Sequence, residues 1–423
     1  MKKLLLVSTA IAGVAFMSAP ASADVKLDLG GYFRGYGVWS DNNEPTGTSL
    51  REFEFRRDTE IHFTGETTLD NGLTVGAHTE MKTGNNANTV TTDEVYAYAS
   101  GGWGRVNLGV EDGAAYLLQV GAPSADSNVD GMRVYIQGFN PTAAQGTAAA
   151  GVFGVNGAFA STVATGYVLD YDHADFSKQE RITFLTPKFS GFQAGVSYAP
   201  DDTGYHGGIA TMATDSGVGL VTAGTLTTAA QYEDLWELAA RWDGEFQGFG
   251  LSLGGGYSSA DVEATLSDAA LIALLAGSYY VNDVDTWNFG GSVAFSGFSL
   301  GANWMQANTD RTSETVAATS VGTSDITRET WVYGGAYDNG PYHLGVSYLD
   351  QETDYDSNNG TGGQLIAATA YEADKFTVGG GYTFGPGMTF RGAVAWGELD
   401  TPGATSASDN DFTQVTVGTD IQF

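Results

Sequence analysis

Charged side chains stand on the polar face of several alternating segments, and such a face could line a passage through a membrane. They are Arg34, Arg56, Glu60, Glu80, Lys82, Arg105, Arg181, Arg241 and Arg391. A charged residue on the lipid face of a spanning strand costs roughly 2 to 4 kcal/mol at the bilayer midplane, so these residues would have to face inward. A charged inner wall orients polar solutes and excludes apolar ones. Alternatively the charges satisfy one another as ion pairs, and both interpretations can hold together.

The histidines show no spacing typical of a catalytic or zinc site. The chain contains no HExxH motif and no cysteine, which leaves no thiolate ligand for zinc. His62 and His78 alternate with apolar neighbours, which indicates ordinary polar lining rather than a role as ligands. The remaining histidines, His173, His206 and His343, are scattered. The sequence therefore predicts no enzymatic activity and no cofactor.

One acidic stretch resembles a calcium-binding loop. Asp354, Asp356 and Asn358 have the required oxygen spacing, but the glycine comes one residue late and Leu365 occupies the place of the closing glutamate. A plain Asx-rich loop is the favoured interpretation, and a structural divalent cation such as calcium is the alternative.

Period-two alternation predicts the elements that would position these side chains. In the last residues, Val415, Val417, Thr419, Ile421 and Phe423 share one face and polar residues share the other. The region 25–39 alternates in the same way. Because termini normally fray, an ordered last strand needs neighbours, so we expect these two ends to pair and close a sheet.

Short and long connections alternate along the chain. The short ones are rich in turn residues: 69–72, 100–102, 187–191, 244–248, 295–298, 338–341 and 385–387. The long ones are polar: 201–230, 259–284, 308–327 and 352–374. Tight turns at one edge and long loops at the other favour a membrane barrel over a soluble sandwich. About sixteen strands are expected, with eighteen as the alternative.

Composition and charge agree with an exported barrel. Residues 1–23 read as a signal peptide, with two lysines, a short apolar run and cleavage before Asp24. No other stretch reaches the roughly 18 apolar residues of a spanning helix. Without Lys2 and Lys3, sixteen basic and fifty acidic side chains leave a net charge of −34. Nucleic acid is therefore excluded as a partner.

The mature chain resembles the trimeric porins of Gram-negative bacteria, especially those of alphaproteobacteria. The resemblance is carried by the stretches at 62–81, 95–113, 181–201, 334–349 and 383–390. It implies a single pore domain over 24–423, a homotrimer in the bacterial outer membrane, and contacts with lipid and lipopolysaccharide. The terminal Phe423 resembles the signal read by the barrel assembly machinery.

The resemblance also implies that the longest loop, after the fifth strand, folds into the barrel as a constriction. Here that loop is 111–179, and its Gly/Ala stretch 148–159 suits packing against an inner wall. The family often has an arginine after Leu-Gly at the end of the fifth strand, where this chain has Val110. The basic side of the constriction is therefore expected from other strands.

We expect the narrowest point between this loop and a basic wall, with Arg105 and Asp112 as neighbours. The predicted constriction residues are Arg34, Arg56, Arg105, Glu111, Asp112, Asp126 and Asp130. Further lining residues are Glu60, His62, His78, Glu80, Lys82, Arg181 and Arg391. The expected function is passive diffusion of small hydrophilic solutes and ions with a preference for cations. The alternatives are a substrate-selective channel, an adhesin or a barrel enzyme.

Overall fold

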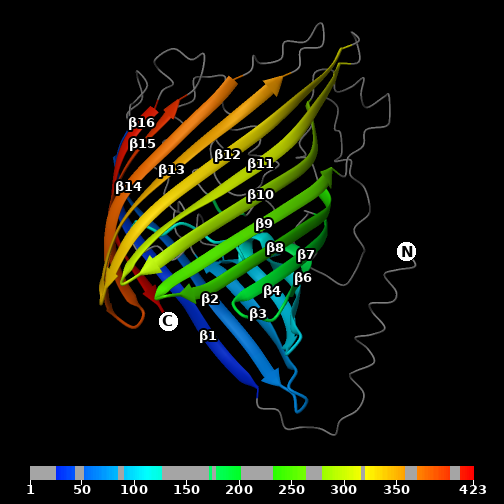
Figure 1. The fold of residues 1–423 in the computed structure, drawn as a ribbon, viewed down its shortest axis with the longest axis vertical. Coiled ribbons are helices and arrows are strands. Elements are labelled where there is room, and N and C mark those ends of the chain that lie inside the picture. The colour runs from blue at the N-terminus through cyan, green and yellow to red at the C-terminus, as the bar shows by residue number, and fades with distance from the viewer. Residues whose placement is uncertain are drawn as a thin grey trace, which may run out of the picture.

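The alternating segments form strands in the computed structural model, and these strands close into one antiparallel barrel (Figure 1). The structure describes residues 25–42, 52–83, 90–125, 171–173, 178–201, 232–262, 279–315, 320–357, 369–400 and 410–423. The expected signal peptide lies outside them. Sixteen strands are found in the described residues, which confirms the lower of the two expected numbers.

Neighbouring strands in the barrel are also neighbours in sequence, apart from the closing pair. The strands are β1 (Lys26–Asn42), β2 (Phe53–Thr68), β3 (Thr74–Thr83), β4 (Val90–Gly101), β5 (Gly104–Glu111), β6 (Gln179–Leu185), β7 (Phe192–Asp201), β8 (Tyr232–Phe246), β9 (Phe249–Val262), β10 (Tyr279–Phe295), β11 (Phe298–Thr315), β12 (Ser320–Asn339), β13 (Tyr342–Ser357), β14 (Thr369–Gly385), β15 (Met388–Asp400) and β16 (Asn410–Gln422).

All seven predicted short turns join consecutive strands at one edge of the barrel, which we call the turn end; the opposite edge is the loop end. Gln247 with Gly248, and Ser296 with Gly297, have the positive φ angles of tight hairpin turns. Several strands extend further toward the loop end than expected. β11 runs to Thr315 and β12 begins at Ser320, so most of the predicted loop 308–327 is hairpin.

The two faces of the wall differ as the alternation predicts. Leu253, Leu300 and Leu344 point outward and are more than half exposed, whereas Asn288 and Asn303 on the opposite face are almost fully buried. Aromatic pairs gather on the outer face in two belts, such as Phe249 with Phe295 (ring centroids 4.5 Å apart) and Tyr257 with Trp287 (4.3 Å). Along β10, the eight residue steps from Trp287 to Phe295 span about 21 Å of height for a strand tilted by about 40°. An apolar outer band between aromatic girdles is thus present.

One short helix, α2 (Ala114–Leu117), follows β5. No helix in the described part of the chain is long and apolar enough to cross a membrane.

The ends of the chain pair with each other, as predicted. β1 and β16 are antiparallel neighbours from Tyr32 opposite Gln422 to Asn42 opposite Phe412. The Phe423 N–H donates to the Gly31 carbonyl (3.1 Å), and the Gly31 N–H donates to the Phe423 carbonyl (3.0 Å). The last residue therefore supplies two hydrogen bonds of the closing seam.

Deleting Phe423 should lower the amount of folded, heat-modifiable barrel in outer membranes, because both seam hydrogen bonds and the terminal aromatic are lost. Phe423→Ala retains the backbone pairing, so it separates the effect of the ring from that of the seam. The molecules that do fold should conduct like the parent. Normal membrane levels of the truncated protein would contradict this prediction.

Candidate functional site

The first part of the predicted constriction loop lies inside the barrel. Residues 113–125 leave the end of β5, form α2, and continue along the inner wall past β7, β8, β9, β10, β11, β12 and β13. We call residues 113–125 the inward segment and the space enclosed by the barrel the lumen. β5 ends at Glu111 and β6 begins at Gln179, which are the bounds expected for this loop, and its role as a constriction stays a prediction.

Lumen-facing glycines make room for the inward segment. Gly254 on β9 lies opposite Gly290 on β10, and Gly301 on β11 lies opposite Gly334 on β12. A Cβ on Gly290 would overlap the carbonyl oxygen of Val120, and one on Gly334 would overlap that of Pro123. The same holds for Gly345 on β13, whose Cβ would lie 2.5 Å from the Ser124 carbonyl oxygen. We call these five glycines the glycine track, and they let the backbone of the segment lie directly on the wall.

A buried ion pair anchors the start of the inward segment. The Arg181 guanidinium on β6 donates to the Glu237 carboxylate on β8 (Nη1 to Oε1, 2.5 Å). The other carboxylate oxygen accepts the Ala115 N–H at 2.9 Å, and the Ser197 hydroxyl accepts the Ala114 N–H at 2.8 Å. Side chains of the wall thus satisfy amides in the first turn of α2 that have no partner within the helix.

Residues 171–173, near the end of the loop, are held beside the inward segment. The Gln119 side chain donates to the Tyr171 carbonyl (2.7 Å) and accepts the His173 N–H (2.9 Å). The His173 ring is buried between Ser258 Oγ and Asn288 Nδ2, each at 2.7 Å from a ring nitrogen. His173, which the sequence presents as one of several scattered histidines, therefore helps to fix the loop to β9 and β10.

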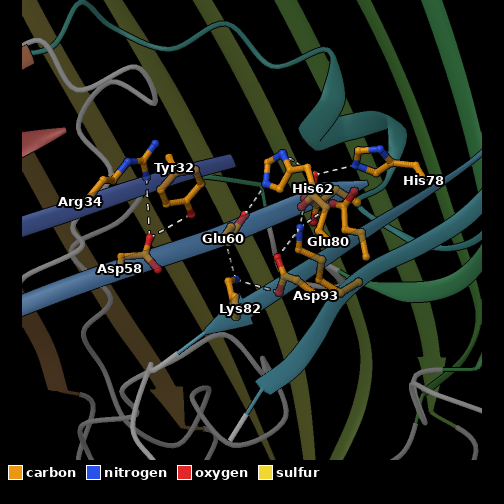
Figure 2. A network of polar contacts seen from close by, with 12 residues as sticks. Tyr32, Arg34, Asp58, Glu60, His62, His78, Glu80, Lys82 and Asp93 are labelled. Atoms are coloured by element: carbon orange, nitrogen blue, oxygen red, sulfur yellow. Dashed lines mark hydrogen bonds and ion pairs between the residues drawn. The ribbon is translucent and has the colours of Figure 1, made fainter. Parts of the chain in front are cut away.

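Opposite the glycine track, the wall formed by β2, β3, β4 and β5 carries a dense group of charges, which we call the acidic cluster (Figure 2). Lys82 Nζ pairs with Glu60 (3.5 Å) and Asp93 (2.8 Å). The remaining members are Glu80, Glu94, Asp112, Lys178, His62 and His78. Five carboxylates therefore stand against two lysines, so the cluster is negative while its histidines are neutral.

A lysine in the loop just before β6 joins three members of the cluster. Lys178 Nζ lies 2.5 Å from Glu94, 2.8 Å from Asp112 and 3.3 Å from Asp93. Burial alone would lower the pKa of Lys178, but the carboxylates of Asp112, Glu94 and Asp93 outweigh it and raise the pKa above the usual value. The ammonium stays charged at neutral pH and ties the loop to β4.

The two histidines of the cluster meet at Glu80. In the β2–β3 register His62 lies opposite Glu80, and Thr64 lies opposite His78. His78 Nε2 is 2.9 Å from Glu80 Oε1, and His62 Nδ1 is 3.7 Å from the same oxygen. The sequence interpretation treated these histidines as separate lining residues, but the register brings them together on the lumen face.

A separate charged group with two arginines lies where β1 pairs with β16 and closes the barrel. Arg34 on β1 and Arg391 on β15 both approach Asp420 on β16, at 3.5 and 3.8 Å, and Arg34 also approaches Asp58 at 3.9 Å. Arg391 donates to the Tyr36 hydroxyl. These arginines face the lumen, and Asp58 and Asp420, with which they form these ion pairs, belong to the barrel wall rather than to the inward segment.

The prediction that Arg105 and Asp112 are neighbours is wrong. Arg105 is near the turn end of β5 and Asp112 follows the other end, so seven residue steps along an extended strand, about 23 Å, separate them. Arg105 instead donates to Asn107 (2.6 Å) and stacks over the Tyr98 ring (4.0 Å).

The other predicted constriction residues differ in position. Arg56 faces the lumen near the loop end, where it is exposed and pairs with Glu54 on its own strand. Glu111 is buried and accepts a hydrogen bond from Asn107 (2.7 Å). Asp126, Asp130 and the stretch 148–159 lie outside the described residues. A direct role of these residues in a constriction stays a prediction.

The predicted calcium stretch is largely a strand rather than a loop. β13 continues to Ser357, and Asp354 and Asp356 lie opposite Thr327 and Asp325 of β12. Extended backbone cannot wrap around a cation as a calcium loop does. Asn358 is outside the described residues, so calcium binding there stays a prediction without the loop geometry that suggested it.

A closed antiparallel barrel with an apolar outer belt, a polar lumen and a segment folded inward is the architecture of an outer-membrane channel. The chain belongs to the Gram-negative porin family, whose family model matches residues 8–402. It is thus a porin of the bacterial outer membrane. Comparison with curated protein sequences gives no significant match.

Three solved structures are similar over nearly the whole barrel. OmpF of Salmonella typhi in complex with daunomycin has a TM-score of 0.55 and 18% identity, covering 94% of this chain and 98% of that one. The anion-selective porin from Comamonas acidovorans has a TM-score of 0.54 and 16% identity, with 95% and 100% covered. OmpT of Vibrio cholerae in its trimer form has a TM-score of 0.54 and 11% identity, with 94% and 99% covered. At such identities the likeness concerns the fold.

Proposed function

We propose that this porin conducts small hydrophilic solutes and ions by passive diffusion and prefers cations. The observation that carries the preference is the acidic cluster, in which carboxylates outnumber lysines on the wall opposite the inward segment. Fixed negative charge beside a narrow water-filled passage raises the local concentration of cations. The net charge of −34 expected for the mature chain acts in the same direction.

We also propose a homotrimer in contact with outer-membrane lipid and lipopolysaccharide and inserted by the barrel assembly machinery. The outer face of β3 and β4 supports self-association, because small residues meet there in register, with Ala77 opposite Ala97. Both are exposed in the single chain. Small apolar side chains of this kind allow close packing against another copy.

The reversal potential of the reconstituted channel in a gradient of dilute KCl should indicate cation preference. The preference should weaken as salt rises, because the Debye length is about 10 Å at 0.1 M and about 3 Å at 1 M. Removing one carboxylate of the acidic cluster, as in Asp112→Asn, should reduce the preference more than Glu245→Gln at the exposed turn end. Anion preference in dilute KCl would overturn the proposal.

A further inference from the structure

We propose that His62, His78 and Glu80 form a binding site for a divalent transition-metal ion of the zinc class inside the lumen. Among the described residues, these three bring one potential ligand atom each to within 4.8 Å of one another. Figure 2 shows the three side chains on the neighbouring strands β2 and β3.

The spacing of the ligand atoms is close to what a zinc ion needs. Bonds of about 2.1 Å at a tetrahedral angle place two ligand atoms about 3.4 Å apart. Glu80 Oε1 is 2.9 Å from His78 Nε2 and 3.7 Å from His62 Nδ1. These two distances lie on either side of the required value, so small rotations of the side chains would admit the ion.

Each imidazole is also held by an acceptor on its far side. His62 Nε2 is 3.1 Å from Glu60 Oε2, and His78 Nδ1 is 2.7 Å from Thr64 Oγ1. If the outer nitrogen donates its proton to that acceptor, the inner nitrogen keeps its lone pair and faces Glu80. A carboxylate or hydroxyl behind a ligating histidine fixes the tautomer and the ring orientation in the same way at known metal sites.

The lysines of the cluster do not fill this position. Lys82 pairs with Glu60 and Asp93, and Lys178 pairs with Asp93, Glu94 and Asp112. Glu80 instead lies beside the two histidines, which carry charge only when protonated. A second acidic grouping, Glu60 with Glu80 and Asp93, is already partly neutralised by Lys82.

The chemistry of the ligands selects the kind of ion. Two imidazoles and one carboxylate suit zinc, copper or nickel, whereas calcium and magnesium prefer oxygen ligands alone. With three protein ligands, a fourth position stays open toward the lumen for water or a solute. The His62 side chain keeps 28% of its surface exposed, so an ion can enter from the lumen water.

Isothermal titration calorimetry with Zn²⁺ on the purified, detergent-solubilised protein tests the site, and this measurement does not depend on the conduction of the channel. We expect one Zn²⁺ per protomer, with no competition from excess Mg²⁺. The double variant His62→Gln/His78→Gln should weaken binding by more than 100-fold, since loss of an outer hydrogen-bond partner alone costs about 10 to 100-fold. Thr64→Val, which removes such a partner, should weaken binding about 10-fold.

Two variants that each remove one carboxylate distinguish Zn²⁺ binding at this site from nonspecific attraction of cations by acidic residues. Glu80→Gln should abolish measurable binding, whereas Glu66→Gln, which removes a carboxylate nearer the turn end of β2, should bind Zn²⁺ like the parent. Heat-modifiability on gels shows that each variant is folded. Absence of Zn²⁺ binding by the parent, or unchanged binding by the folded double histidine variant, would overturn the assignment.

Discussion

Gly290→Ala should lower the single-channel conductance and destabilise the barrel by about 1 to 3 kcal/mol, the usual cost of overpacking. The new Cβ would overlap the Val120 carbonyl oxygen, so the inward segment and the wall cannot keep their present separation. The segment is held on both sides of Val120, through Ala115 to Glu237 and through Ser124 to His343. We therefore expect it to move away from the wall, into the lumen.

Gly392→Ala on β15 is the matched control. A Cβ there would meet the Thr416 carbonyl oxygen at 3.6 Å, an ordinary contact, and replacing a strand glycine by alanine is otherwise mildly favourable. Gly334→Ala, which would overlap Pro123, should repeat the effect of Gly290→Ala. Single-channel conductance is measured in planar bilayers, and thermal stability is measured by heat-modifiability on gels. If Gly290→Ala and Gly392→Ala behave alike, the glycine track does not position the segment.

The wall of the barrel could be predicted from sequence because the features that determine it are local in the sequence. Alternation, turn residues and the apolar outer face each follow from a few neighbouring residues, as in the turns at Gly248 and Gly297. The lengths of the strands at the loop end were underestimated. There the wall needs no apolar face, so polar residues such as Thr323 on β12 pair in strands without the expected alternation.

The composition of the acidic cluster was only partly predictable. Glu80 and Lys82 follow from alternation on β3, but Asp93 and Glu94 are successive residues that both enter the cluster. The register between β3 and β4 shifts here, with Thr79 opposite Val95 and Met81 opposite Thr92. A bulge of this kind re-aims side chains, and nothing in the local sequence marks its position.

The contacts of the loop depend on distant residues and were therefore missed. Lys178 precedes β6 in sequence, but it meets carboxylates on β4 and at the end of β5. In the sequence Glu237 is an ordinary polar residue of an alternating strand. Only the structure shows that it accepts hydrogen bonds from Arg181 and from the Ala115 amide. Gly254 and Gly290 lie in different strands, and only the register places them side by side in the glycine track.

Breaking the Arg181–Glu237 pair from one side should destabilise the folded barrel strongly. Both side chains are nearly fully buried, and removing one partner of such a pair typically costs about 3 to 5 kcal/mol because a buried charge remains. We expect losses of this size for Arg181→Met and for Glu237→Leu, measured as urea-driven unfolding in lipid vesicles.

The double variant Arg181→Met/Glu237→Leu should recover much of that loss, since neither member of the pair is left as a buried charge without its partner and the volume stays filled. Recovery should be incomplete, because the Ala115 N–H loses its acceptor, and an unsatisfied buried donor costs about 1 to 3 kcal/mol. Its channel should therefore be noisier than that of the parent even where its stability is restored, as the first turn of α2 is no longer held to β8. If the two single losses simply add in the double variant, the residues are not energetically coupled. The anchoring of the inward segment would then rest on its other contacts, the Ser197 hydroxyl and the glycine track.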